Sequence, residues 1–217
     1  MEKILKTMPF EIIINYDQIK HFDYHIPLFC LPRILKTDLT NIPIFEQYIF
    51  PEIEPWNEKL SEYKIKIGIA WRGNPEHDND HNRSLPVEKF AEILKDAPKD
   101  ITFFGLQKNV TEKERTALSQ YNNFVDLCDD LHNFIDTGNI VVNLDLIISV
   151  DTSVVHLSGA CGRNTWVLLP FAPDWRWLLE REDSPWYPTL RLFRQTAPGG
   201  NWDGVIQQIK ENLICPE

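Results

Sequence analysis

Three neighbouring residues, Asp151, Thr152 and Ser153, follow an apolar stretch at the point where the spacing of apolar residues changes. Side-chain oxygens of Asp, Thr and Ser accept hydrogen bonds from the free N–H groups of a helix's first turn. We therefore expect Asp151 to cap a helix over residues 152–162. Capping needs only one such residue, and three are present here. His156 lies four residues after Thr152 and three after Ser153, so helical spacing places it on their face.

The start of this expected helix is suited to an anion. Free N–H groups and the helix dipole attract negative charge, and small hydroxyl side chains such as those of Thr152 and Ser153 leave room for it. The pattern favours a phosphate or diphosphate. Asp151 repels an anion, so we expect it to accept hydrogen bonds from the hydroxyls of a sugar. The competing interpretation is a helix cap without a ligand.

Other polar residues follow apolar segments that alternate like strands. They are Arg72, Asn74 and Arg83 after residues 65–71, and Gln107 after residues 101–106. Arginine presents paired N–H donors that match phosphate oxygens, which makes Arg72 and Arg83 candidates for the same anion. Ordinary surface ion pairs are the alternative for either arginine.

A metal site is a weaker possibility in the loop that holds Asp78 and Asp80, a D-x-D pair flanked by histidines. Such a pair suits a divalent cation on a diphosphate. The calcium-binding EF-hand pattern fails, because Arg83 stands where glycine is required and Lys89 where the bidentate glutamate belongs. We expect a solvated loop without a metal.

Aromatic residues crowd the segment 170–188, which contains Trp175, Trp177, Trp186 and Tyr187. Packing in the core or between domains is the ordinary reason for such density. Stacking on a base or a sugar is the alternative.

The elements that must position these residues alternate along the chain. Strands are predicted at 65–71, 101–106, 124–127, 146–150, 165–170 and 190–195, and helices at 85–98, 111–121, the later part of 132–144, 152–162 and 202–214. This order predicts an α/β fold with a Rossmann-like parallel sheet and helices on both faces. Ligands bind such sheets at the carboxyl ends of the strands, where the candidate residues lie.

The first sixty residues follow another pattern, with strands expected at 10–16 and 22–28 and a linker at 51–64. We expect residues 1–58 to form a partial N-terminal α/β portion with a linker, and residues 59–217 to form the C-terminal domain. The four cysteines form no C-x-x-C pair or zinc spacing, and we expect reduced core thiols.

Composition limits the partners. The net charge of −10 argues against nucleic acid as a ligand, since phosphate backbones need a basic face. No signal peptide and no apolar run of membrane-spanning length is present, so we expect a cytoplasmic protein with no transmembrane segment.

Several stretches together closely resemble one family. They are "GIAWRGNPEHDNDHNRSLP", "FFGLQK", and the run from Asp136 to Gln195 that contains "ISVDTSVVHLSGACG". The resemblance is to the donor-binding half of glycosyltransferase family 9, the heptosyltransferase-like proteins, and to bacterial domains of this type found with tetratricopeptide repeats. It covers residues 64–213.

The resemblance implies a GT-B architecture of two Rossmann-like domains and an inverting transfer that needs neither metal nor cofactor. The donor is a nucleotide-diphosphate sugar, and the acceptor, a glycan, lipid or protein, stays open. In the family, the D-T/S-x-x-x-H stretch grips the donor, which here means Asp151, Thr152, Ser153 and His156. Arg83 matches the family's basic residue after the first donor-domain strand.

One departure concerns catalysis. The family's first domain opens with a glycine-rich loop and then an acidic catalytic base, and neither precedes residue 64 here. The catalytic residues are therefore unknown, and we expect an N-terminally shortened chain. The leading hypothesis is a glycosyltransferase. A non-catalytic nucleotide-sugar-binding or interaction module and a metal-dependent D-x-D transferase are the alternatives.

Overall fold

The computed structural model describes residue 17, residue 19 and residues 21–214. Its centre is a six-stranded sheet with the order β3-β2-β1-β4-β5-β6, in which every neighbouring pair is parallel. The strands are β1 (Ile65–Ala70), β2 (Ile101–Gly105), β3 (Phe124–Asp126), β4 (Leu146–Val150), β5 (Thr165–Leu169) and β6 (Leu190–Arg194). The chain winds outward from β1 to β3, then returns and winds the other way from β4, so β1 and β4 flank the switch point.

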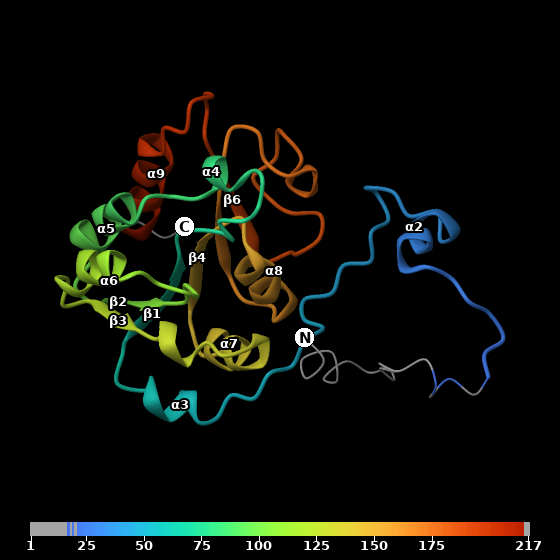
Figure 1. The fold of residues 1–217 in the computed structure, drawn as a ribbon, viewed down its shortest axis with the longest axis horizontal. Helices are drawn as coiled ribbons and strands as arrows, with labels where there is room; N and C mark the ends of the chain where they lie inside the picture. The colour runs from blue at the N-terminus through green and yellow to red at the C-terminus, as the bar shows by residue number, and fades with distance from the viewer. Residues whose placement is uncertain (1–16, 18, 20, 215–217) are drawn as a thin grey trace.

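Helices cover both faces of this sheet (Figure 1). They are α4 (Asp80–Arg83), α5 (Val87–Asp96), α6 (Glu112–Ser119), α7 (Phe134–Val141), α8 (Ser153–Ala160) and α9 (Asp203–Ile214). Neighbouring residues of one strand serve opposite faces, because side chains alternate along a strand. Phe103 of β2 packs in the core beneath α5, α6 and α9, and Phe104 packs in the core beneath α7 and α8. The predicted fold class is confirmed.

Local sequence accounts for the helix ends. Thr111 begins α6 through a capping box. The Thr111 hydroxyl accepts from the Glu114 N–H, and the Glu114 carboxylate accepts from the Thr111 N–H. Gly162 follows α8 with a φ of 68°, the left-handed conformation that glycine adopts without strain. A Cβ there would also lie 2.6 Å from the Glu46 carbonyl oxygen. This position therefore requires glycine.

Residues 21–55, which we call the N-terminal arm, extend away from the sheet before the chain returns to it (Figure 1). The strand predicted at 22–28 is wrong: this segment is irregular and leads into η2 (Leu28–Cys30) and α2 (Leu31–Ile34). It meets no partner strand in the described part of the chain, and Phe29 is 95% exposed. The strand predicted at 10–16 lies outside the described residues.

The end of the arm is attached to the domain through backbone contacts. The N–H groups of Tyr48 and Ile49 both donate to the Ala160 carbonyl at the end of α8. Asn143 donates to the Ile53 carbonyl at 2.8 Å. The predicted linker at 51–64 contains one short helix, α3 (Trp56–Lys59). None of the helices in the described ranges is long and apolar enough to cross a membrane.

Candidate functional site

A cavity of about 550 Å³ lies at the switch point of the sheet, and we call it the switch cavity. Strand register explains its place: Ile69 of β1 is level with Gly105 of β2 and Ile148 of β4, so the three strands end together. Its walls are residues from the ends of these strands and from the starts of two helices. They are Ala70, Arg72, Gly73, Asn74, Pro75, Arg83, Leu106, Gln107, Lys108, Asn109, Leu131, Asn133, Phe134, Thr137, Thr152, Ser153, Val154 and Leu157.

The first turn of α8 forms one wall. Asp151 was expected to cap this helix, and the structure corrects that: Thr152 is the N-cap, and its hydroxyl accepts from the Val154 N–H at 3.1 Å. The helix begins one residue later than predicted, so Asp151 precedes the cap. The Asp151 side chain is buried outside the cavity walls, and its carbonyl accepts from Arg83 at 3.1 Å.

The first turn of α7 forms a second wall that the sequence analysis missed. Asn133 caps α7 and accepts from the N–H groups of Ile135 and Asp136, in a capping box with the Asp136 carboxylate. The pattern N-x-x-D at 133–136 is a signal that could have located this helix start. Two helix N-termini thus border one cavity. Their dipoles favour an anion there.

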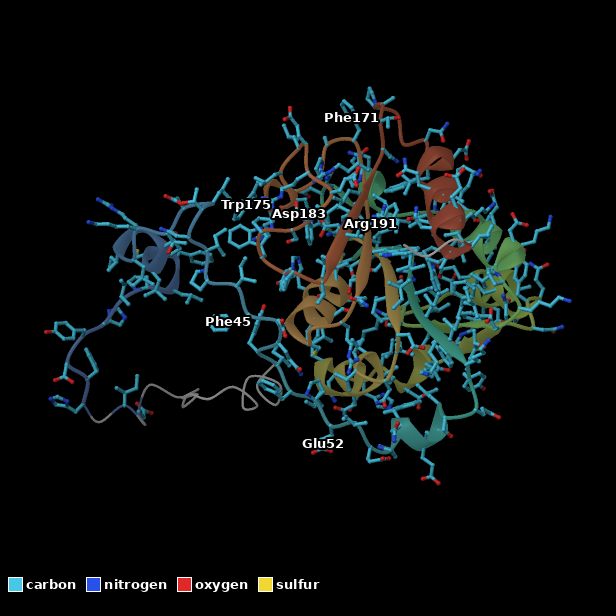
Figure 2. The ribbon with its side chains drawn as sticks, turned by 180° about the vertical axis from the view of Figure 1, so that it is seen from behind. Phe45, Glu52, Phe171, Trp175, Asp183 and Arg191 are labelled. Atoms are coloured by element: carbon cyan, nitrogen blue, oxygen red, sulfur yellow. The ribbon has the colours of Figure 1, made fainter. Side chains whose placement is uncertain are left out.

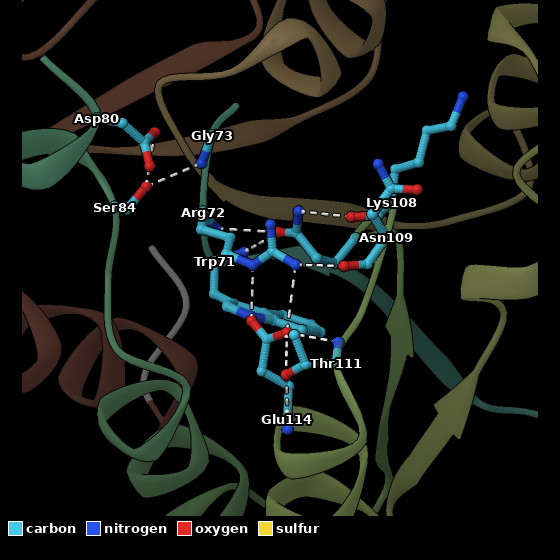
Figure 3. A network of polar contacts seen from close by, with 10 residues as sticks. Trp71, Arg72, Gly73, Asp80, Ser84, Lys108, Asn109, Thr111 and Glu114 are labelled. Carbon is cyan, nitrogen blue, oxygen red and sulfur yellow. Dashed lines mark hydrogen bonds and ion pairs between the residues drawn. The ribbon is translucent and has the colours of Figure 1, made fainter. Parts of the chain in front are cut away.

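Arg72 is held at the rim of the switch cavity by a buried network (Figure 3). Its guanidinium pairs with Glu114 at 2.7 Å and donates to the Asn109 carbonyl. Burial alone would raise the pKa of Glu114, but hydrogen bonds from Arg72, Thr111 and Trp71 lower it to about 2. Glu114 therefore carries a charge at neutral pH, and it neutralises part of the Arg72 charge.

Gln107 lines the cavity and also fixes the end of β1. Its side-chain oxygen accepts from the backbone N–H groups of Trp71 and Arg72 at 3.2 and 3.0 Å. Its amide donates to the Lys108 carbonyl at 3.3 Å. Gln107, a predicted donor-binding residue, thus lines the cavity and also positions the backbone at its rim.

Arg83 lies at the end of α4, a helix in a segment predicted to be a loop. Its guanidinium pairs with Asp80 at 3.2 Å and lies directly against Gly73, where a Cβ would be 2.5 Å from Nη2. Asn74 is exposed at the same rim, and its side-chain oxygen accepts from the Glu76 N–H. Six of the eight predicted site residues therefore line one cavity: Arg72, Asn74, Arg83, Gln107, Thr152 and Ser153.

His156 does not share the cavity of Thr152 and Ser153. Its ring stacks on Trp177 with centroids 5.3 Å apart, and its Nδ1 lies 3.2 Å from the Tyr187 hydroxyl. Burial lowers the pKa of His156. The spacing argument failed because Val154 and Leu157 are the residues of α8 that border the switch cavity beside Thr152 and Ser153, whereas His156 lines a different cavity.

Lys108 is a further cation of the cavity that the sequence analysis missed. It is exposed and forms no ion pair with a described residue, unlike Arg72 and Arg83. Its place directly after Gln107 at a strand end was the available signal. Among the described residues, those that line the cavity include no Asp, Glu or His. The cavity therefore offers positive charge, amides and hydroxyls, but no carboxylate.

The D-x-D pair does not form a metal centre with other residues of the described chain. No group of three or more His, Cys, Asp or Glu side chains there is placed to hold a metal ion. The Asp80 carboxylate accepts from the Ser84 hydroxyl at 2.9 Å and pairs with Arg83. Of the cysteines, Cys128 and Cys161 are free and buried as predicted. Cys30 is free but exposed, so the core position predicted for it is wrong, and Cys215 lies outside the described residues.

The doubly wound sheet and its switch-point cavity define a Rossmann-like α/β domain. Its fold is heptosyltransferase-like, that of glycosyltransferase family 9 proteins of GT-B-like architecture. No protein-family model matches the chain, and no curated protein matches its sequence.

Two solved structures carry this comparison of folds. The glycosyl transferase family 9 protein of Veillonella parvula is 12% identical, with a TM-score of 0.53 over 78% of this chain and 52% of that one. The ADP-heptose LPS heptosyltransferase II of E. coli is 16% identical, with a TM-score of 0.51 over 77% of this chain and 53% of that one. The chain spans about half the length of the structures it matches.

Proposed function

We propose that this chain binds a nucleotide-diphosphate sugar in the switch cavity and acts in glycosyl transfer. The observation that carries the proposal is the convergence of two helix N-termini, at Asn133 and Thr152, on a cavity that also contains Arg72, Arg83 and Lys108. The E. coli protein of similar fold is named for ADP-heptose, a donor of this class. The domain division at residues 58 and 59 belongs to the same proposal.

The chemistry follows from where charge develops. When a sugar leaves its diphosphate, negative charge grows on the diphosphate oxygens, and donors fixed in advance stabilise it without reorganisation. The N–H groups at the start of α8, the hydroxyls of Thr152 and Ser153, and the Arg83 guanidinium are such donors. They supply positive charge without a metal. A metal-independent transfer is the reaction that this arrangement supports best, and inversion is proposed from the family resemblance.

A second candidate function is a binding module that holds the donor without transferring its sugar. The absence of Asp, Glu and His from the walls of the switch cavity favours it, because the transfer needs a group that takes the acceptor's proton. Removal of a general base typically costs about 10²–10⁴-fold in rate. The two candidates share the donor site and differ in turnover.

Calorimetric titration with ADP, UDP and GDP tests the donor site. We expect a nucleoside diphosphate to bind, and we expect Arg83→Ala and Thr152→Ala each to weaken binding by about tenfold, the loss expected for one charge-assisted contact. Lys113→Ala is the matched control, because Lys113 is a highly exposed cation that pairs with Glu88 outside the cavity. Absence of binding, or equal losses in all three variants, would contradict the proposal.

Turnover separates the remaining alternatives. Release of nucleoside diphosphate from a bound sugar donor would favour the transferase, and binding without release would favour the module. A metal-dependent D-x-D transferase requires that a chelator abolish release and that Asp78→Ala with Asp80→Ala do the same. We expect the chelator to leave the rate of nucleoside diphosphate release unchanged.

A further inference from the structure

A second cavity, of about 300 Å³, lies where the N-terminal arm meets α8 and the segment after β5, and we call it the arm cavity. Its walls come from three separate parts of the chain and are mostly aromatic. They are Ile42, Pro43, Tyr48, His156, Trp175, Arg176, Trp186 and Tyr187. Its volume is at the lower end of those that bind small molecules, so it suits a single ring.

Two tryptophans form a corner of the arm cavity. The rings of Trp175 and Trp186 lie 6.1 Å apart at an angle of 88°, and the Trp186 indole is fixed by donation to the Arg176 carbonyl at 2.8 Å. Trp175 is 65% exposed, and Figure 2 shows it at the edge of the domain that faces the arm. The Arg176 guanidinium lies over one face of the Trp175 ring, 4.7 Å from its centroid, so a sugar would place its C–H face on the opposite face of the indole.

Polar groups occupy the rest of the wall. Its cation, Arg176, pairs with Asp174 at 2.8 Å, which offsets part of the Arg176 charge. The Tyr48 and Tyr187 hydroxyls are hydrogen-bonded to each other, and His156 lies 3.2 Å from the Tyr187 oxygen. Burial lowers the pKa of His156, which favours its neutral form. A neutral ligand rich in hydroxyls fits this wall better than an anion does.

The arm cavity is separate from the switch cavity but close to it. The two share no lining residue. Both cavities border α8: Ser153 lines the switch cavity and His156 lines the arm cavity. These residues are three apart, which corresponds to a rise of about 4.5 Å along the helix. The switch cavity, of about 550 Å³, is the larger of the two and suits a nucleotide-sized ligand. Because the two linings are separate, we assign the arm cavity to a second molecule.

We propose that the arm cavity binds a pyranose ring of the acceptor, stacked on Trp175 beside the donor site. The assignment to the acceptor rests on the proposed function, whereas the sugar site itself rests on the aromatic corner and the neutral polar wall. The arm supplies part of this site through Tyr48, so the arm and the C-terminal domain bind the acceptor together.

Saturation-transfer difference NMR on the full chain tests this site. The probes are the methyl glycosides of glucose, galactose, mannose and N-acetylglucosamine. We expect at least one glycoside to bind and Trp175→Ala to weaken it by about tenfold, through loss of ring stacking. Phe171→Ala is the matched control, because Phe171 is an exposed aromatic residue of the same segment outside the cavity wall (Figure 2).

Competition distinguishes the two cavities. We expect glycoside binding to persist when the nucleoside diphosphate that binds best is added. Displacement by the nucleotide, equal loss in both variants, no loss in Trp175→Ala, or no glycoside binding would each overturn the sugar site. Calorimetry on the same samples reports donor binding separately. Glycoside binding without nucleotide binding would refute the proposed donor site and the acceptor assignment while the sugar site stands.

Discussion

Glu114 is the residue through which acid should loosen the switch cavity. Its carboxylate accepts from the Trp71 indole at 2.7 Å and pairs with Arg72 at 2.7 Å, and it closes the capping box of α6. Substitution of Glu114 by Gln keeps the size of the side chain and removes its charge. The pair with Arg72 is lost. In either orientation the new amide NH2 faces a donor, the N–H of Thr111 or the indole N–H of Trp71.

The size of the effect follows from the pKa of Glu114, which falls from 4.5 to about 2 in the folded chain. A difference of this size corresponds to about 3 kcal/mol of stabilisation. Contact of this side chain with solvent reduces the expected figure to about 2 kcal/mol. A carboxyl group whose pKa is lower in the folded chain than in the unfolded chain stabilises the fold at pH values above its unfolded pKa. The contribution is therefore complete above pH 4.5 and disappears as the pH falls through about 2.

Urea unfolding of the wild-type chain and of the Glu114→Gln variant across pH 2–7 measures the contribution of ionised Glu114 to the unfolding free energy. We expect a difference in unfolding free energy of about 2 kcal/mol at pH 7 that shrinks below pH 4.5. Glu88→Gln is the control, because Glu88 pairs with Lys113 at the surface, and its loss should change stability by less than about 0.5 kcal/mol. A difference for Glu114→Gln that stays constant with pH would refute the reasoning, since the ionised form would not be the stabilising one.

Three further predictions concern the cavity and the thiols. Gly73→Ala should displace the Arg83 guanidinium, whose Nη2 would lie 2.5 Å from the new Cβ, and calorimetry should show weaker nucleotide binding with little change in melting temperature. Asn133→Ala should lower the unfolding free energy by about 1 kcal/mol in urea titrations, through loss of the α7 cap. Burial raises the pKa of Cys161 to about 12, so iodoacetamide should label the exposed Cys30 in the native chain and leave Cys161 unlabelled, as peptide mapping would show.

The sheet and its helices could be predicted because each signal was local. The alternation along 65–71 and the helical spacing along 85–98 each place apolar side chains on one buried face. The predicted elements from residue 65 onward match the structure to within a few residues at their ends. The segment 22–28 misled the same reasoning, because apolar residues form a strand only where a partner strand pairs with them, and the described chain has none beside this segment.

The location of the candidate site could be predicted from the sequence, but the roles of its individual residues were harder to predict. Strand ends locate the cavity from the order of elements alone. Whether Asp151 or Thr152 caps α8 depends on where the helix begins, to one residue, and element boundaries are the least certain part of a sequence prediction. The position of His156 depends on Trp177 and Tyr187, which come from a segment with no regular period. Tertiary packing alone could show that it faces another cavity.

If the proposed function is right, the two cavities hold the two substrates of glycosyl transfer separately. The switch cavity offers donors for a leaving diphosphate and no carboxylate or imidazole to accept a proton. The titratable side chain one helical turn further, His156, belongs to the arm cavity and is hydrogen-bonded to Tyr187 there. Under the proposed function, the leaving diphosphate and the acceptor would therefore be held by different parts of the chain. A chain that binds donor and glycoside but releases nucleotide slowly would favour the binding module over the transferase, because loss of a general base typically costs about 10²–10⁴-fold in rate.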